Sequence, residues 1–152
     1  MHIIAAKAVA FNEAMTPEFN DYQRQIVANA KVLAEGLLQK GMELISGGTD
    51  NHIVLVNLSN TDLTGLEAEK ALTKAGIYIN RNNIPFDKRG PNVTSGIRLG
   101  TPALTTRGMK EEEMKNIAEW IIKVLEKPYD DKVLGDVRSM VYSLCSQFSL
   151  DY

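Results

Sequence analysis

An apolar stripe over residues 19–37 limits the fold of this chain more than any other feature. The stripe recurs at three- and four-residue steps, the period of one helix face, and consists of Phe19, Tyr22, Ile26, Ala30, Leu33 and Leu37. Thr16-Pro17-Glu18 is a helix-start signal, with Thr as N-cap and Pro in the first turn. Gly41 is a natural C-terminal cap. The pattern therefore predicts a long helix that ends near Lys40.

Residues 2–14 form a second helical segment of unusual composition. Ala, Ile and Val dominate it, and only Lys7, Asn12 and Glu13 are strongly polar. A helix that is apolar nearly all round is normally buried. We therefore expect this helix to be buried, and its abrupt start indicates a missing N-terminal part that covers it.

The rest of the chain alternates short β-rich runs with helical stripes. Thr64 and Glu67 form a capping box for a helix that Gly76 ends. The remaining predicted elements are strands at 42–45 and 52–58 in a hairpin, short strands at 77–79 and 97–99, a polar loop at 80–96, a turn at 101–108, and helices at 110–126 and 131–148. This order predicts an α+β fold, in which helices cover a small, mainly antiparallel sheet.

Composition excludes several classes of function. Lys and Arg total 17 against 19 Asp and Glu, so no basic excess favours nucleic acid or an acidic membrane. The single Cys145 excludes an internal disulfide and a cysteine-based zinc site, and with two histidines no metal site is expected. No apolar run approaches the roughly 20 residues that cross a bilayer, and the N-terminus is a poor signal peptide. We expect a cytoplasmic protein.

Arg98 is the most informative single residue. It lies in a predicted strand between Ile97 and Leu99, beside the flexible Thr94-Ser95-Gly96. A guanidinium group in such a place can clamp a carboxylate through two parallel hydrogen bonds. A structural ion pair or an exposed edge-strand charge is the alternative interpretation.

The loop at 80–96 is the second candidate, with two prolines, two glycines and four asparagines. Asn80, Asn82 and Asn83 offer amide donors and acceptors, and Gly90-Pro91-Asn92 is a rigid turn. Long polar loops inside compact domains are usually functional or disordered, and a solvated crossover is the alternative. His52 enters an apolar strand, where a core histidine is the simpler interpretation.

Read together, several segments resemble one enzyme family. SGGTDNHIVLVNL, LTGLEAEKALTKAGIYIN, VTSGIRLGTPALTTRG and the opening HIIAAKAVAFNEAMTPEFNDYQRQIVANAK are similar to the C-terminal part of serine hydroxymethyltransferase. The similarity covers essentially the whole chain, in order. It implies a fold-type I enzyme that uses pyridoxal 5′-phosphate to convert serine and tetrahydrofolate into glycine and methylenetetrahydrofolate.

The resemblance also implies a division of the chain and roles for its residues. Residues 1–40 would hold the N-terminal buried helix and the long interdomain helix, and residues 41–152 the small C-terminal α/β-sandwich domain. Arg98 would bind the substrate carboxylate, and Asn82 would lie near the folate pterin. Gly90, Pro91 and Asn92 match a folate-site loop in which the family commonly has Ser-Pro-Phe, so this chain lacks the serine and the aromatic ring there.

The family's cofactor lysine, ring-stacking aromatic residue, aspartate and general-acid glutamate all match positions upstream of Met1. We therefore expect no catalytic residue in this chain, and we expect the isolated chain to be inactive. Its implied partners are the N-terminal large domain of the same enzyme, serine or glycine, folate, and further copies in a homodimer or tetramer. A non-catalytic carboxylate- or folate-binding module, or an oligomerisation module, is the alternative.

Overall fold

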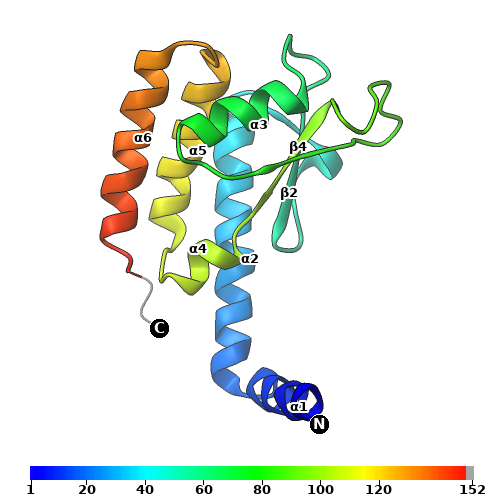
Figure 1. Cartoon of the computed structure of the whole chain (residues 1–152), viewed down its shortest axis with the longest axis vertical. Coiled ribbons are helices and arrows are strands. Elements are labelled where there is room, and N and C mark those ends of the chain that lie inside the picture. The colour runs from blue at the N-terminus through cyan, green and yellow to red at the C-terminus, as the bar shows by residue number, and fades with distance from the viewer. Residues whose placement is uncertain (150–152) are drawn as a thin grey trace.

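The computed structural model describes residues 1–149, which form an α+β fold (Figure 1). The elements are α1 (His2–Ala14), α2 (Pro17–Gln39), β1 (Glu43–Leu44), the 3-10 turn η1 (Ile45–Gly47), β2 (Ile53–Asn57), α3 (Gly65–Lys74), β3 (Asn80–Asn82), β4 (Gly96–Gly100), α4 (Pro102–Thr106), α5 (Glu111–Glu126) and α6 (Asp131–Ser146). The predicted fold class is confirmed.

The sheet is antiparallel throughout, in the order β1-β2-β4-β3. The predicted hairpin is present, because Leu44 of β1 pairs with Val56 of β2. Strand β4 lies between β2 and β3, and Arg98 pairs with Leu55 on one side and Asn80 on the other. Arg98 is therefore on an internal strand.

Two predicted elements were wrong. The segment 77–79 is not a strand, because the residues that pair with β4 are Asn80–Asn82, at the start of the predicted loop. Ile77 and Ile79 instead pack, partly buried, against the hydrophobic core. The predicted turn at 101–108 contains the short helix α4, which has Pro102 in its first turn.

One face of the sheet packs on helices and the other is open (Figure 1). Val54 and Val56 of β2 and Ile97 and Leu99 of β4 point into the core, where they join α2, α3 and α5. Since side chains alternate along a strand, the residues between them lie on the open face. From Ile26 onward α2 contributes to this core, with Leu33 and Leu37 buried.

The predicted helix starts are confirmed by their capping bonds. The backbone N–H of Phe19 donates to Thr16 Oγ1 at 3.2 Å. The backbone N–H groups of Glu67 and Thr64 exchange bonds with each other's side chains, which is the capping box expected at α3. Such side-chain caps satisfy N–H groups that the first turn leaves unpaired.

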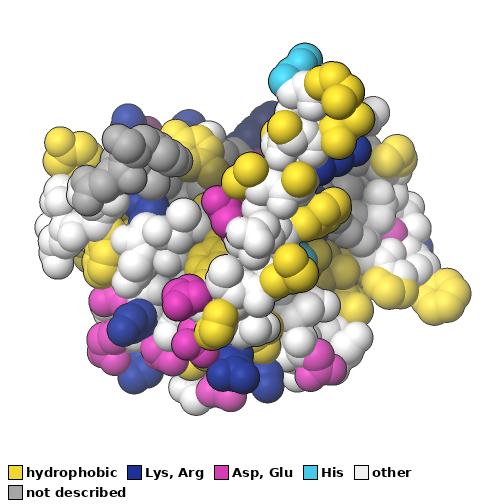
Figure 2. Space-filling view, turned by 90° about the horizontal axis from the view of Figure 1, so that it is seen from below, with side chains coloured by type: hydrophobic (Ala, Val, Ile, Leu, Met, Phe, Trp, Pro, Cys, Tyr) yellow, Lys and Arg dark blue, Asp and Glu magenta, His cyan; other side chains and the backbone are white. Residues whose placement is uncertain are grey.

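Helix α1 projects from the rest of the structure (Figure 1). None of its residues is buried within this chain, so the predicted burial is not met by residues 1–149. Figure 2 shows hydrophobic side chains along this projecting surface. The large exposed ones on α1 and just after it are Ile3, Ile4, Val9, Phe11 and Met15.

The division of the chain into a helical part at residues 1–40 and a C-terminal domain at residues 41–152 stays a prediction.

Candidate functional site

The open face of the sheet carries Arg98 in a cross-strand row with Leu55 and Asn80. Arg98 is exposed, and among residues 1–149 its guanidinium has no hydrogen-bond or ion-pair partner. The two alternative interpretations of Arg98 therefore fail within this part of the chain. It has no structural ion pair, and it does not lie on an edge strand.

A hollow of about 550 Å³ surrounds Arg98 on this face. It is lined by His52, Ile53, Tyr78, Ile79, Asn80, Arg98, Leu99 and Gly100. The lining has no acidic side chain, whereas a guanidinium, an amide, an imidazole and a phenol supply hydrogen-bond donors. The arrangement can therefore bind the two oxygens of a carboxylate.

His52 corrects an expectation. It is exposed at the edge of this hollow and is not a core histidine. Its neighbour Ile53 begins β2, and the backbone carbonyl of His52 accepts a 3.3 Å bond from the N–H of Thr101. That bond ties the turn before β2 to the end of β4. Sequence reasoning did not connect His52 or Tyr78 with Arg98, because their proximity follows from strand register.

Asn82 lies on the same open face, opposite Gly96 and one row from Arg98. Its Nδ2 donates to the carbonyl of Asn83 at 2.7 Å. This local bond orients the amide and leaves Oδ1 as an acceptor. Asn82 is half-buried, so the strand holds it in place while its acceptor stays available.

Asp87 organises the loop that follows β3, and sequence reasoning missed it. Its carboxylate accepts bonds from the backbone N–H groups of Arg89 at 2.9 Å and Ser95 at 2.9 Å, and from Ser95 Oγ at 2.7 Å. Longer bonds come from Asn83 Nδ2 at 3.1 Å and the N–H of Ile84 at 3.3 Å. Burial raises the pKa of Asp87, but these donors outweigh it and hold the pKa well below its usual value.

The turn Gly90-Pro91-Asn92 is exposed. The carbonyl of Gly90 accepts bonds from the N–H groups of Val93 and Thr94, each at 3.0 Å. The residue after the turn, Val93, is bonded to the start of α3, because its carbonyl accepts a 3.0 Å bond from the N–H of Leu66. None of the three turn residues lines the hollow around Arg98. Asn82 does not line it either, so Asn82 is related to Arg98 by their shared sheet face and not by the hollow.

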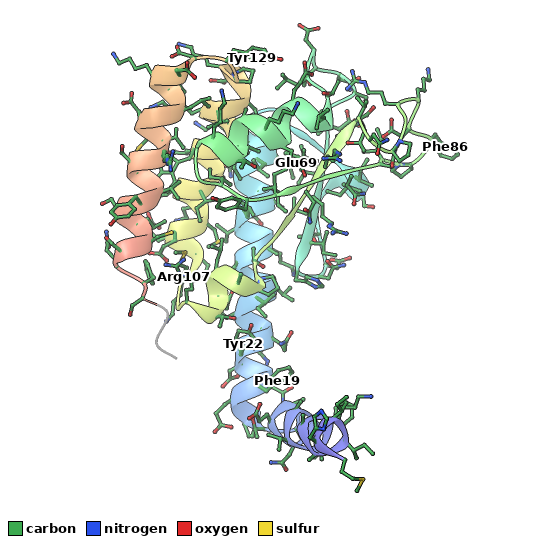
Figure 3. All side chains as sticks on the ribbon, viewed as in Figure 1. Phe19, Tyr22, Glu69, Phe86, Arg107 and Tyr129 are labelled. Carbon is green, nitrogen blue, oxygen red and sulfur yellow. The ribbon has the colours of Figure 1, made fainter. Side chains whose placement is uncertain are left out.

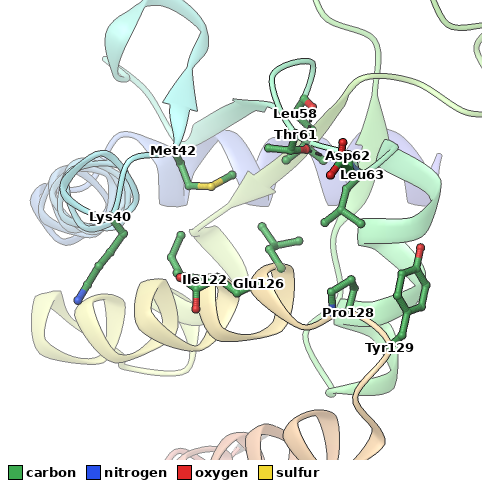
Figure 4. Close-up of a pocket in the computed structure, with 11 residues that line it drawn as sticks. Lys40, Met42, Leu58, Thr61, Asp62, Leu63, Ile122, Glu126, Pro128 and Tyr129 are labelled. Carbon is green, nitrogen blue, oxygen red and sulfur yellow. Dashed lines mark hydrogen bonds between the residues drawn. The ribbon is translucent and has the colours of Figure 1, made fainter.

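A separate hollow of about 370 Å³ lies between the end of α5 and the segment after β2 (Figure 4). Its walls are mostly apolar, with Met42, Leu58 and Ile122 among them, and the Thr61 hydroxyl beside it donates to the carbonyl of Leu58 at 2.8 Å. No candidate residue from the sequence lies in it.

No helix within residues 1–149 is long and apolar enough to span a membrane. No group of three or more His, Cys, Asp or Glu side chains there is placed to hold a metal ion.

Fold and site together define a helix-backed antiparallel sheet whose open face presents an unpaired arginine. The family model of serine hydroxymethyltransferase matches residues 1–121 of the 152-residue chain. The chain belongs to the serine hydroxymethyltransferase family, whose intact members are transferases. The match covers α1 through most of α5 and includes every candidate site residue.

Proposed function

We propose that this chain supplies the substrate-carboxylate site of a serine hydroxymethyltransferase, in which serine and tetrahydrofolate yield glycine and methylenetetrahydrofolate. Arg98 is the residue that binds the carboxylate of the amino acid. The observation that carries the proposal is the unpaired guanidinium of Arg98 on an internal strand, facing a hollow without acidic residues.

Arg98 suits this role because its backbone is held from both sides. Leu55 and Asn80 pair with it across the sheet, so the base of the side chain has a defined position. A guanidinium offers two parallel N–H groups that match both oxygens of a carboxylate. Positioning the carboxylate fixes the orientation of the substrate's α-carbon, and orientation is a large part of what an enzyme contributes to such a reaction.

The folate part of the proposal involves Asn82, Gly90, Pro91 and Asn92. Asn82 is supported by its place on the face of Arg98, with Oδ1 available to accept a bond from a pterin ring. The turn has less support, because it is not part of the sheet and the next residue, Val93, is bonded to the start of α3. Neither Asn82 nor the turn lines the Arg98 hollow. Asn92 stands where the family commonly has an aromatic ring, so it cannot supply the same stacking contact.

Pyridoxal 5′-phosphate supplies an electron sink to this reaction when it is bound. The residues around Arg98 cannot bind this cofactor by themselves. Its Schiff base needs a lysine, and no lysine lines the Arg98 hollow. We therefore place the cofactor on the N-terminal large domain of the intact enzyme, and we propose that the isolated chain is inactive. Borohydride reduction in the presence of the cofactor, followed by peptide mapping, tests this. A stoichiometric adduct at one lysine with serine turnover would contradict it.

The exposed apolar surface of α1 supports a large-domain partner. Phe11 and Met15 are 68% and 75% exposed, and Ile4 is 65% exposed. Clustered apolar side chains of this kind ordinarily mark an interaction surface. We propose that the large domain covers α1 in the intact enzyme, which forms a homodimer or tetramer.

Reconstitution tests the proposed function as a whole. The chain is mixed with a large-domain polypeptide of the family, and serine-to-glycine conversion is measured with wild type, Arg98→Lys and Arg98→Gln. We expect restored activity with wild type, a raised KM for serine with Arg98→Lys, and near-complete loss with Arg98→Gln. Equal KM values in all three proteins would refute the role of Arg98.

The alternative is a binding or oligomerisation module without chemistry. Failure of every reconstitution, together with folate binding by the chain in calorimetry, would favour the binding module. If reconstitution fails and the chain also does not bind folate, an oligomerisation module is the remaining alternative.

A further inference from the structure

A further hollow, of about 340 Å³, lies where α6 packs against the rest of the fold. Helix α6 runs beside α5 (Figure 1), and the lining also takes in α2, the segment 76–79, the end of β4 and α4. Arg107 and Met109, between α4 and α5, complete it. Among the lining residues within 1–149, Arg107 is the one that carries a charge, and none is acidic. We call this space the Arg107 hollow.

The walls of the Arg107 hollow are mostly apolar and come from several elements. Ile77 and Ile79 precede β3, Trp120 belongs to α5 and Leu144 to α6, and all four pack against the core while staying partly exposed. A concave space lined mainly by apolar and aromatic side chains, with few polar groups, is typical of small-molecule sites. An apolar cavity of about 150 Å³ holds benzene. The Arg107 hollow, at about 340 Å³, therefore has room for a two-ring group or a medium-length alkyl chain.

Arg107 is held in a defined orientation by the end of α6. Its Nε and Nη2 donate to the carbonyl of Phe148 at 3.0 and 2.8 Å, and Nη2 also donates to the carbonyl of Cys145 at 2.9 Å. Figure 3 shows the residue beside this end of α6. The bonds satisfy carbonyl groups that the last turn of a helix leaves unpaired. Nη1 has no hydrogen-bond or ion-pair partner among residues 1–149, so its two N–H groups are unused.

The positive charge of Arg107 has no carboxylate to balance it in this part of the chain. Its partners are neutral carbonyl groups, and the lining supplies no acid within residues 1–149. A charged donor beside apolar walls attracts an anionic oxygen more strongly than the same donor does in water. An inorganic anion would leave the apolar walls unused, and a purely apolar molecule would leave Nη1 unused. The lining therefore favours one molecule that combines both features.

We propose that the Arg107 hollow is a binding site for a small monocarboxylate with an apolar body, whose carboxylate binds Nη1 of Arg107. An aromatic acid and a medium-chain fatty acid share this chemistry. The site is distinct from the one assigned above to the amino-acid substrate, because Arg98 lines only one of the two hollows and Arg107 only the other. The two hollows adjoin, and they share the lining residues Tyr78, Ile79, Leu99 and Gly100.

Trp120 provides a direct readout, because it is the single tryptophan of the sequence and lines the Arg107 hollow. The isotopically labelled 152-residue chain is titrated with indoleacetate and, separately, with octanoate, and the indole N–H signal of Trp120 is followed by NMR. We expect a saturable shift, and the tighter of the two probes identifies the ligand as an aromatic or an aliphatic acid. Indoleacetamide, the uncharged match of indoleacetate, should bind about tenfold more weakly, the scale of one lost charged hydrogen bond.

Ala103→Phe is the variant that blocks the Arg107 hollow. Ala103 lines the hollow but is exposed, so a larger side chain can occupy the space at little cost to the fold. We expect its affinity for indoleacetate to fall at least about tenfold while its melting temperature is unchanged. Ser143→Phe is the matched control, because it adds the same ring at an exposed position of α6 that does not line the hollow. It should bind like wild type.

Arg107→Gln tests the carboxylate contact. The substitution also removes three hydrogen bonds to the end of α6, so the readout is the ratio of the two affinities, for indoleacetate and indoleacetamide, within one protein. We expect the preference for the acid to fall from about tenfold to none. Arg107→Lys keeps the charge and should keep a preference for the acid, which tests the contact even where the glutamine variant does not fold.

Four results would overturn the proposal. The first three are no saturable shift of Trp120, equal affinity of wild type for the acid and the amide, and wild-type affinity in Ala103→Phe. The fourth is loss of binding in Arg98→Gln, which would assign the probe to the Arg98 hollow.

A competing occupant is the C-terminal end of the chain itself. Tighter probe binding by a chain with Leu150→Ser and Tyr152→Ser would identify these residues as the occupant and would also overturn the proposal. Every measurement is made on the chain alone. Failure of reconstituted turnover with intact probe binding would therefore count against the proposed function only, and the reverse result would count against this site only.

Discussion

The carboxamide of Asn29 in α2 and the hydroxyl of Thr105 in α4 form a buried hydrogen bond of 2.9 Å. Asn29 Nδ2 also donates to the carbonyl of Met109 at 2.9 Å, and Gln25 donates to Asn29 Oδ1 at 3.0 Å. Helix α4 begins two residues after β4, so this cluster of hydrogen bonds holds α2 close to the end of the strand that carries Arg98. The position of the candidate site therefore depends on α2.

Asn29→Leu is expected to destabilise the fold by about 2–3 kcal/mol. The change leaves the carbonyl of Met109 without this donor in a buried place, and the cost of an unsatisfied buried group exceeds the worth of an average hydrogen bond. Urea unfolding measures the difference. Gln23→Ala, on the exposed side of the same helix, is the control and changes stability by less than about 0.5 kcal/mol. Equal stabilities for Asn29→Leu and wild type would contradict the structural role of the cluster.

Gly65→Ala tests the contact between the start of α3 and the segment before β4. A Cβ atom at Gly65 would lie 2.1 Å from Thr94 Oγ1 and 2.5 Å from the carbonyl oxygen of Gly96. Both atoms belong to buried residues, so relief requires a backbone shift, and we expect a loss of about 2–4 kcal/mol.

Gly135→Ala is the matched control for Gly65→Ala. A Cβ atom there meets nothing within 4 Å, in the middle of α6. Replacing an exposed helical glycine with alanine is expected to stabilise by about 0.5–1 kcal/mol. Thermal unfolding of the two variants should therefore shift in opposite directions, and shifts of the same sign would contradict the close approach of α3 to Thr94.

Features that depend on residues close together in the sequence were predicted better than features that depend on pairing between distant residues. The Thr16 and Thr64 caps were predictable because each cap and its partner lie within three residues of one another. The strand at 77–79 was predicted wrongly because β-branched content favours a strand there. A strand also needs a partner strand, and the residues that pair with β4 are Asn80–Asn82.

The candidate site was predictable only in part for the same reason. Arg98 was identified from its apolar neighbours, but its proximity to His52 depends on the register between β2 and β4. Asp87 was missed because its strongest partners include Ser95, eight residues away across a loop. Asn29 carried a signal that could have been used, since it is a polar residue on a helix face that is otherwise buried and apolar.

Asp87→Asn is expected to change the pH dependence of stability. Burial raises the pKa of Asp87, but hydrogen bonds from Ser95 and Arg89 outweigh that effect and hold the pKa below its usual value of 3.8 in the folded chain. A lowered folded pKa means that the ionised group stabilises the fold above about pH 4 and that this contribution is lost as pH falls toward the folded pKa.

The free energy of unfolding of Asp87→Asn should therefore lie below that of wild type at pH 7, and the gap should narrow between about pH 5 and pH 3. Other carboxyl groups titrate in both proteins, so the difference isolates Asp87. Chemical denaturation at several pH values measures it, and a gap that stays constant down to about pH 3 would be inconsistent with the charged hydrogen bonds described.

Self-association of the isolated chain is expected to depend on α1. The helix has no buried residue, and its apolar side chains are mostly more than half exposed. A double substitution, Ile4→Glu with Phe11→Ser, should reduce self-association in analytical ultracentrifugation and leave the melting temperature within about 2 °C, since it removes no core contact. A chain that is monomeric at all concentrations before substitution would refute the expectation.

Arg98→Gln separates binding from folding at the candidate site. The guanidinium makes no hydrogen bond or ion pair within residues 1–149, so its removal costs the fold little, and we expect a change below about 0.5 kcal/mol in the free energy of unfolding. Arg81 is the matched comparison, because it forms a half-buried ion pair with Glu69 of α3 and donates its backbone N–H to the same carboxylate. Arg81→Gln should therefore destabilise the chain measurably more, by about 1–2 kcal/mol. If Arg98→Gln were instead the more damaging of the two in urea unfolding, Arg98 would have a structural role, and the argument that its free guanidinium is kept for a ligand would fail.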